Sequence, residues 1–179
     1  MIHRILALAL KSGVATVRYP RQPPILTEEF RGFLVFDPTK CVGCGACTRV
    51  CPANAMNLEI RGNEIVVEYF AGRCILCHLC FYACPFGALV ATTSFDRTTT
   101  NFEDLFDRVA HEGAACPSCG SIHATKRLIQ FVDLVLKSEG IEIEDRLRLC
   151  PECRRIEALR ALNAFRIGME REGVEHGVE

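Results

Sequence analysis

The chain has 179 residues, a formal net charge of -1 and an apolar fraction of 49%. This length allows one ordinary domain or two small ones, and the composition excludes a disordered chain. The balanced charge excludes a bulk binder of nucleic acid. The sequence has 12 cysteines but no secretory signal at its start, so we expect a reducing, cytoplasmic compartment in which thiols hold metal.

Residues 1–32 are predicted to form an N-terminal amphipathic helix followed by an extended arm. They contain no cysteine, and they carry five cations but only two anions. Ile2, Ile5 and Leu6 follow helical spacing as far as Gly13. Such a helix lies on a membrane surface, docks on a membrane protein or packs on its own domain, and the spacing leaves these alternatives open. Because the apolar run at residues 5–10 is too short to span a bilayer, we expect no transmembrane helix.

Residues 33–95 contain an internal repeat, which predicts a compact domain. The motif Cys-x2-Cys-x2-Cys-x3-Cys-Pro occurs at residues 41–52 and again 33 residues later, at residues 74–85. Between the copies, residues 58–61 and 64–68 alternate around Gly62-Asn63, which predicts a β-hairpin with a two-residue turn. Residues 33–36 and 88–91 are predicted strands that could pair with each other.

The repeated motif is typical of proteins that hold two 4Fe-4S clusters. Three close cysteines bind one cluster, and the fourth cysteine of each copy reaches the other cluster. The predicted ligands of cluster 1 are Cys41, Cys44, Cys47 and Cys84, and those of cluster 2 are Cys74, Cys77, Cys80 and Cys51. We find no nucleophile–base pair and no dinucleotide-binding glycine fingerprint, so no catalytic residue is predicted. These features favour an electron carrier.

Two other interpretations concern the second copy of the motif. Cys74, Cys77 and His78 also fit the attachment pattern of a c-type haem, but the haem would consume two thiols that the clusters need. A zinc knuckle would leave the third close cysteine of each copy unexplained. His78 itself is either a packing or surface residue, or a group whose protonation shifts the potential of the neighbouring cluster.

Residues 96–179 are predicted to form a helical extension with a further metal site. A polar linker at residues 94–101 precedes helices expected over residues 102–111, 124–137 and 155–171. Two Cys-x2-Cys pairs interrupt them, formed by Cys116, Cys119, Cys150 and Cys153. Four thiolates suit a structural Zn²⁺ or a rubredoxin-type iron, and four free thiols are the alternative. No basic stripe accompanies these pairs, so we expect no nucleic-acid role.

Several segments of this sequence resemble those of a known protein family. Residues 16–20 (Thr-Val-Arg-Tyr-Pro), residues 30–32 (Phe-Arg-Gly) and the two cysteine motifs are similar to the two-cluster ferredoxin subunit of respiratory complex I and of membrane-bound NiFe hydrogenases. The extra pairs, especially Cys150-Pro151-Glu152-Cys153, resemble the narrower group found in formate hydrogenlyase and hydrogenase-4. The resemblance implies an α+β fold: a two-cluster bacterial ferredoxin-like core, an N-terminal docking arm and a helical metal-binding C-terminal extension.

The resemblance also implies a role inside a membrane-associated oxidoreductase. The chain would relay single electrons between an iron-sulfur electron-input subunit and the large and small subunits of a NiFe hydrogenase, without a substrate-converting site of its own. It would lie peripherally on the cytoplasmic side of the cell membrane, with its N-terminal helix against a membrane arm subunit. The alternatives are the equivalent subunit of a complex I-type quinone oxidoreductase and a free-standing ferredoxin or adaptor.

Overall fold

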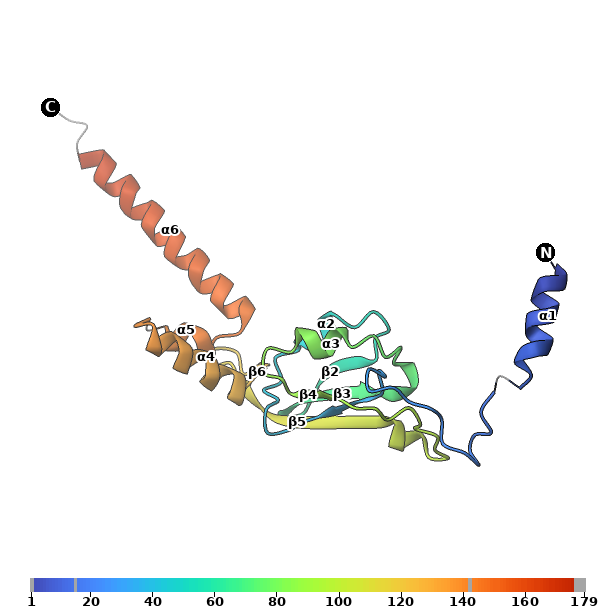
Figure 1. Ribbon diagram of the computed structural model, residues 1–179. Coiled ribbons are helices and arrows are strands. Elements are labelled where there is room, and N and C mark those ends of the chain that lie inside the picture. Colours follow the sequence, from blue (N-terminus) through green and yellow to red (C-terminus); the bar gives the residue numbers. More distant parts are fainter. Residues whose placement is uncertain (1, 15, 142, 176–179) are drawn as a thin grey trace. The chain divides into compact units, whose positions relative to one another are not determined.

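The structure is a computed structural model that describes residues 2–14, 16–141 and 143–175. The chain divides into two units, Met1–Phe30 and Arg31–Glu179, which are described separately below. Figure 1 shows the helices and strands of both units. None of the described helices combines the length and the apolar character needed to cross a membrane.

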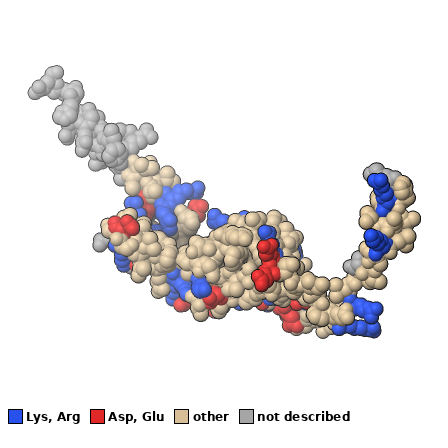
Figure 2. Space-filling view, in the orientation of Figure 1, with Lys and Arg blue, Asp and Glu red and all other residues tan. Residues whose placement is uncertain are grey.

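In the part of the first unit that the structure describes, helix α1 (Ile2–Ser12) is followed by a segment without further helix or strand. Gly13, with φ of 61°, follows the last residue of α1, which is where the sequence predicted the helix to end. None of the described side chains of α1 is buried, and its apolar residues Ile2, Ile5 and Leu6 are all exposed. Lys and Arg side chains lie along this helix and the segment that follows it (Figure 2). The unit therefore presents apolar and basic groups together.

The second unit contains a small antiparallel pair, formed by β1 (Leu34–Phe36) and β4 (Leu89–Ala91). This pairing of the segments on either side of the cysteine motifs confirms the prediction from the sequence. Two short helices, α2 (Ala46–Arg49) and α3 (Leu79–Ala83), each begin after the second cysteine of one motif and contain the third. The two copies of the motif therefore share the same local order of loop and helix.

The main sheet has four antiparallel strands in the order β2-β3-β5-β6. The predicted hairpin is confirmed as β2 (Met56–Arg61) and β3 (Glu64–Phe70), with Gly62 at φ of 60° in the turn. β3 also pairs with β5 (Phe106–Ala115), which pairs with β6 (Ile122–Thr125). The extension thus contributes two strands to the sheet that the ferredoxin-like hairpin begins.

The helix predicted over residues 102–111 is wrong. A short 3-10 turn at Phe102–Leu105 precedes strand β5. Within β5, Val109, His111 and Gly113 are buried while Arg108 and Glu112 are exposed, and this alternation has the period of a strand. Glu103 and Asp104, acidic residues of a kind common in the first turn of a helix, belong to the 3-10 turn, where the Asn101 side chain accepts a hydrogen bond from the Glu103 N–H.

Three helices follow the sheet: α4 (Lys126–Ser138), α5 (Glu144–Arg148) and α6 (Pro151–Glu175). The prediction of helices near residues 124–137 and 155–171 is confirmed, although α6 begins earlier, at the second Cys-x2-Cys pair. Helical spacing places Ile156, Leu159 and Leu162 on one face of α6, and all three are exposed. Phe165 has the same spacing, and its side chain lies outside the described residues.

The main hydrophobic core lies against the cysteine motifs. Its buried residues are Leu34, Ala55, Met56, Tyr69, Ala71, Cys80 and Leu89. The partly buried Cys47, Cys51, Cys74 and Cys84 pack on this cluster. Because the core and the cysteines form one packed group, burial of apolar surface on folding also brings the thiols of both motifs together.

Candidate metal centres

The internal repeat extends to the backbone conformation. Three pairs of residues separated by 33 positions have left-handed φ angles: Gly43 (68°) and Leu76 (55°), Gly45 (73°) and His78 (59°), Asn54 (49°) and Gly87 (59°). Such angles are unusual for residues other than glycine. The two copies therefore wind in the same way, even where the second copy has a side chain in place of glycine.

The first predicted ligand set lines a common cavity. This cavity is bordered by Cys41, Cys44 and Cys47 of the first motif and by Cys84 of the second. Its remaining wall includes the apolar Phe36, Val67, Phe86 and Leu89. The structure thus brings together four thiols that are separated by up to 43 residues in the sequence, in a largely apolar enclosure.

The second predicted set is gathered in the same interleaved manner. The Cys80 thiol lies close enough to Cys51, Cys74 and Cys77 for their charges to act on it. Burial first, and then the charge of Cys51, raises the pKa of Cys80 to about 11. In the first set, burial and then the charges of Cys41 and Cys44 raise the pKa of Cys47 to about 12.

The raised pKa values of Cys47 and Cys80 mean that these two thiols resist ionisation when no cation is bound beside them. An iron-sulfur cluster supplies that positive charge, because its ligands are thiolates and its irons are cationic. Backbone N–H groups are also aimed at the sulfurs, from Ala55 to Cys51 at 3.2 Å and from Ala88 to Cys84 at 3.3 Å. These two bonds are again 33 residues apart, and such donors stabilise sulfur ligands of clusters. The donor sets therefore fit two clusters.

The Tyr69 hydroxyl, which lies near Cys74 of the second ligand set, also fits a bound cluster. Its side chain is almost completely buried, and its hydroxyl has no hydrogen-bond partner among the described residues. Burial first, and then the neighbouring Cys74, raises the pKa of this hydroxyl. A buried hydroxyl without an acceptor is costly, and thiolate or sulfide sulfur of a cluster would supply one.

His78 is a buried packing residue in this structure. Its Nε2 lies 2.8 Å from the carbonyl oxygen of Gly32, two residues before the start of β1. The first of the two interpretations drawn from the sequence was a packing or surface residue, and the burial of His78 makes it a packing residue. The hypothesis that protonation of His78 shifts a cluster potential stays a prediction.

His111 is a site residue that the sequence analysis missed. Its Nε2 lies 3.3 Å from the Sγ of Cys41, although the two residues are 70 positions apart. Burial first, and then the charge of Arg127, lowers the pKa of His111, which favours its neutral form. The misassigned helix concealed this residue. The alternation of Val109, His111 and Gly113 was the signal that could have placed it on the buried face of a strand.

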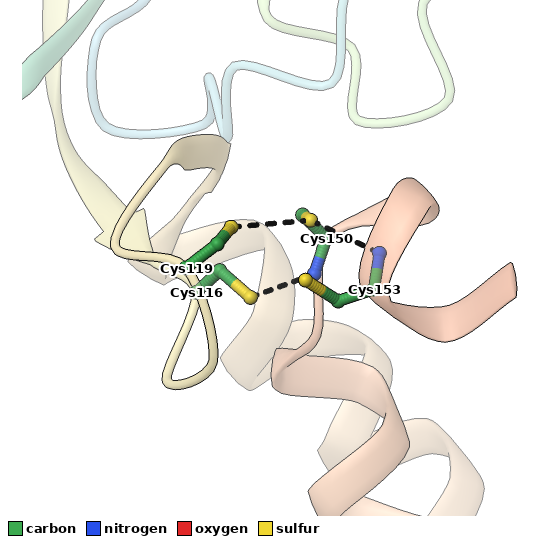
Figure 3. Close-up of side chains that lie close together, drawn as sticks. All are labelled: Cys116, Cys119, Cys150 and Cys153. Carbon is green, nitrogen blue, oxygen red and sulfur yellow. Dashed lines mark hydrogen bonds between the residues drawn. The ribbon is translucent and has the colours of Figure 1, made fainter. Parts of the chain in front are cut away.

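The four C-terminal cysteines form a separate cluster, shown in Figure 3. The sulfurs of Cys116, Cys119, Cys150 and Cys153 all lie within 4.8 Å of one another. The Cys150 N–H donates to the Cys116 Sγ at 3.3 Å, and the Cys153 N–H donates to the Cys150 Sγ at 3.4 Å. Donors of this kind, the Cys150 N–H foremost, lower the pKa of Cys116 to about 6. The set has the ligand type and number of a tetrahedral metal site.

The comparisons with known proteins agree with this geometry. Residues 33–86 match the family described as a 4Fe-4S dicluster domain. Formate hydrogenlyase subunit 6 of Escherichia coli (strain K12) is 30% identical over 156 residues, which cover 84% of this chain and 87% of that protein. NAD(P)H-quinone oxidoreductase subunit I of Gloeobacter violaceus is 34% identical over 104 residues, which cover 50% of this chain and 49% of that protein.

Among solved structures, one chain of the membrane-bound sulfane sulfur reductase (MBS), an archaeal respiratory membrane complex, is 29% identical. The TM-score is 0.41, and the match covers 56% of each chain. The family resemblance predicted from the cysteine motifs is confirmed by the dicluster match and by the relative that aligns along most of the chain. The chain belongs to the family of two-cluster iron-sulfur electron-transfer subunits of oxidoreductases that includes formate hydrogenlyase subunit 6 and quinone oxidoreductase subunit I.

Proposed function

We propose that the chain relays single electrons through two 4Fe-4S clusters with interleaved ligands. Cluster 1 is bound by Cys41, Cys44, Cys47 and Cys84, and cluster 2 is bound by Cys74, Cys77, Cys80 and Cys51. The observation that carries this assignment is the cavity that Cys84 of the second motif shares with the three close cysteines of the first. When bound, the clusters supply one-electron redox chemistry, and the protein sets their potentials through burial and hydrogen bonds.

We further infer that the complex is a membrane-associated NiFe hydrogenase of the formate hydrogenlyase or hydrogenase-4 type. The similarity to formate hydrogenlyase subunit 6 extends along most of both chains, whereas the similarity to quinone oxidoreductase subunit I covers half of each. The partners would be an iron-sulfur input subunit, the hydrogenase large and small subunits and a membrane arm subunit. A complex I-type role is the second candidate, because quinone oxidoreductase subunit I is 34% identical over the half of the chain that it matches.

The C-terminal cysteines are proposed to hold one Zn²⁺, with a rubredoxin-type iron as the alternative. Support comes from the mutual proximity of four sulfurs and from the backbone donors that favour the thiolate forms of Cys116 and Cys150. Since these thiols come from two segments of the extension, a bound ion would connect β5 and β6 with the start of α6. Its role would be structural.

The N-terminal unit is proposed to hold the subunit against the membrane arm on the cytoplasmic side. Helix α1 exposes Ile2, Ile5 and Leu6, and the same unit carries basic side chains (Figure 2). Apolar and basic groups on one short helix suit a membrane interface or a membrane protein. Deletion of residues 2–12 should release the assembled complex from membranes, and membrane association that survives this deletion would contradict the placement.

Native purification of the complex tests the proposed function directly. Metal analysis should find about eight irons and one zinc per chain, with nickel in a co-purifying large subunit. About nine irons without zinc would replace the zinc by a rubredoxin-type iron. Co-purification with quinone reductase subunits and no nickel protein would favour the complex I-type role. A stable monomer with intact clusters and no partners would favour a free-standing ferredoxin.

A further inference from the structure

The C-terminal extension places a hydrogen-bond donor directly on the first cluster site. We propose that His111 of strand β5 donates an N–H···S hydrogen bond to the cluster-bound Cys41 and raises the reduction potential of cluster 1 selectively. The proposal rests on the assignment of Cys41 to cluster 1 made above. It gives the extension a role in electron transfer in addition to any structural role.

The geometry fixes which partner donates. The Nε2 of His111 lies 3.3 Å from the Cys41 Sγ, and both side chains are buried. A cluster-bound thiolate has no proton, so its sulfur can only accept. The imidazole must therefore carry its proton on Nε2, which determines the tautomer of the neutral ring.

The ring is held in place by the sheet and by the cluster loop. In the antiparallel register His111 lies opposite Ile65 of β3, so its position follows from the pairing of the extension with the core. A Cβ atom added at Gly43 would lie 2.9 Å from Cδ2 of His111 and 2.6 Å from Cγ2 of Thr125. The backbone of the cluster loop therefore packs directly on both side chains, which leaves the ring little room to turn away from Cys41.

Two neighbouring contacts connect the same loop to the extension. Thr125 donates from Oγ1 to the carbonyl oxygen of Val42 at 2.5 Å, and its side chain is fully buried. The Arg127 guanidinium donates to the carbonyl oxygens of Pro38 and Thr39, just before Cys41. Residues on both sides of Cys41 thus accept hydrogen bonds from β6 and α4. The contact between His111 and Cys41 belongs to the same interface between the loop and the extension.

The expected effect on potential follows from the charge of the cluster. Reduction adds a negative charge that is spread over the irons, sulfides and thiolates, and a donor to a thiolate stabilises that charge. The bond is worth more in a buried site than in water, because the effective dielectric constant is lower. Removal of the donor should therefore lower the potential of cluster 1. Cluster 2 should keep its potential, because its equivalent cysteine, Cys74, lies beside Tyr69 rather than His111.

The full-length protein with reconstituted clusters provides the test. His111→Phe removes the donor and keeps a planar ring, whereas His111→Gln keeps an N–H group near the same place. His123→Phe is the matched control, because this histidine lies on the adjacent strand and its ring nitrogens are buried without a hydrogen-bond partner among the described residues. Iron and sulfide analysis, redox titration monitored by electron paramagnetic resonance, and pulsed resonance on protein with ¹⁵N-labelled histidine are the measurements.

We expect wild-type protein to show two clusters and a histidine nitrogen coupled to one of them. His111→Phe should abolish that coupling and lower one potential, His111→Gln should restore part of the potential, and His123→Phe should change neither. Unchanged potentials in a fully loaded His111→Phe protein, an equal shift of both, or no nitrogen coupling in the wild type would overturn the proposal. These results would leave the proposed function intact. A wild-type protein that holds only one cluster would instead overturn the assignment of the eight cysteines to two clusters.

Discussion

The imidazole of His78 connects the second cluster motif to the start of the fold: its Nε2 lies 2.8 Å from the carbonyl oxygen of Gly32. His78 has a φ of 59°, and the residue 33 positions earlier, Gly45, has a φ of 73°. A side chain in this conformation is disfavoured by about 1 kcal/mol. The hydrogen bond to Gly32 gives a physical reason for the presence of histidine where the first copy of the motif has glycine.

Substitution of His78 should separate the cost of its left-handed backbone conformation from the stabilisation by its hydrogen bond to Gly32. His78→Leu keeps the disfavoured backbone conformation and leaves the Gly32 carbonyl without its partner, so it should destabilise the loaded protein by about 1–3 kcal/mol. His78→Gly loses the same bond but relieves the backbone, so its loss should be smaller. The temperature at which visible cluster absorbance disappears provides the comparison. If the glycine variant were less stable than the leucine variant, this account of His78 would be wrong.

Gly32 itself should tolerate no side chain. A Cβ atom at this position would lie 2.3 Å from the carbonyl oxygen of Ser94 and 2.5 Å from that of Thr92, and both are backbone atoms. Gly32→Ala should therefore push the two segments apart and cost about 1–3 kcal/mol. Gly62→Ala is the control, because a Cβ there meets nothing within 4 Å and only the φ of 60° opposes it. Equal melting temperatures for the two variants would contradict the steric argument.

The Thr125 hydroxyl should stabilise two elements at once. It donates to the Val42 carbonyl and accepts from the N–H of Leu128 at 3.0 Å, so that it joins the cluster loop to the first turn of α4. Thr125→Val keeps the shape but removes both bonds, and it should destabilise the protein by about 1–3 kcal/mol. Thr125→Ser keeps the hydroxyl and should recover most of this loss. Chemical denaturation followed by circular dichroism would compare the three proteins, and equal stabilities of the valine variant and the wild type would exclude this role.

The parts of the fold that could be predicted depend on short-range patterns. Cysteine spacing predicted the dicluster domain, and strand alternation around Gly62 predicted the hairpin, because each involves neighbouring residues. The contact between His111 and Cys41 depends instead on the pairing of β3 with β5, which no local pattern specifies. Residues 102–111 were misassigned because their acidic first residues resemble a helix start, whereas pairing with an existing sheet determines their conformation.

The C-terminal metal site should be independent of the clusters in its metal content. Cys150→Ser removes one of the four proposed ligands, so the protein should lose its zinc and keep about eight irons. Cys77→Ser is the reciprocal variant and should lose iron while zinc stays. Without the ion, the connection between the Cys116–Cys119 turn and the start of α6 is weakened, so trypsin should cleave faster after Arg148 and Arg154. Metal analysis and limited proteolysis would check this, and a Cys150→Ser protein with full zinc content and unchanged cleavage would contradict the site.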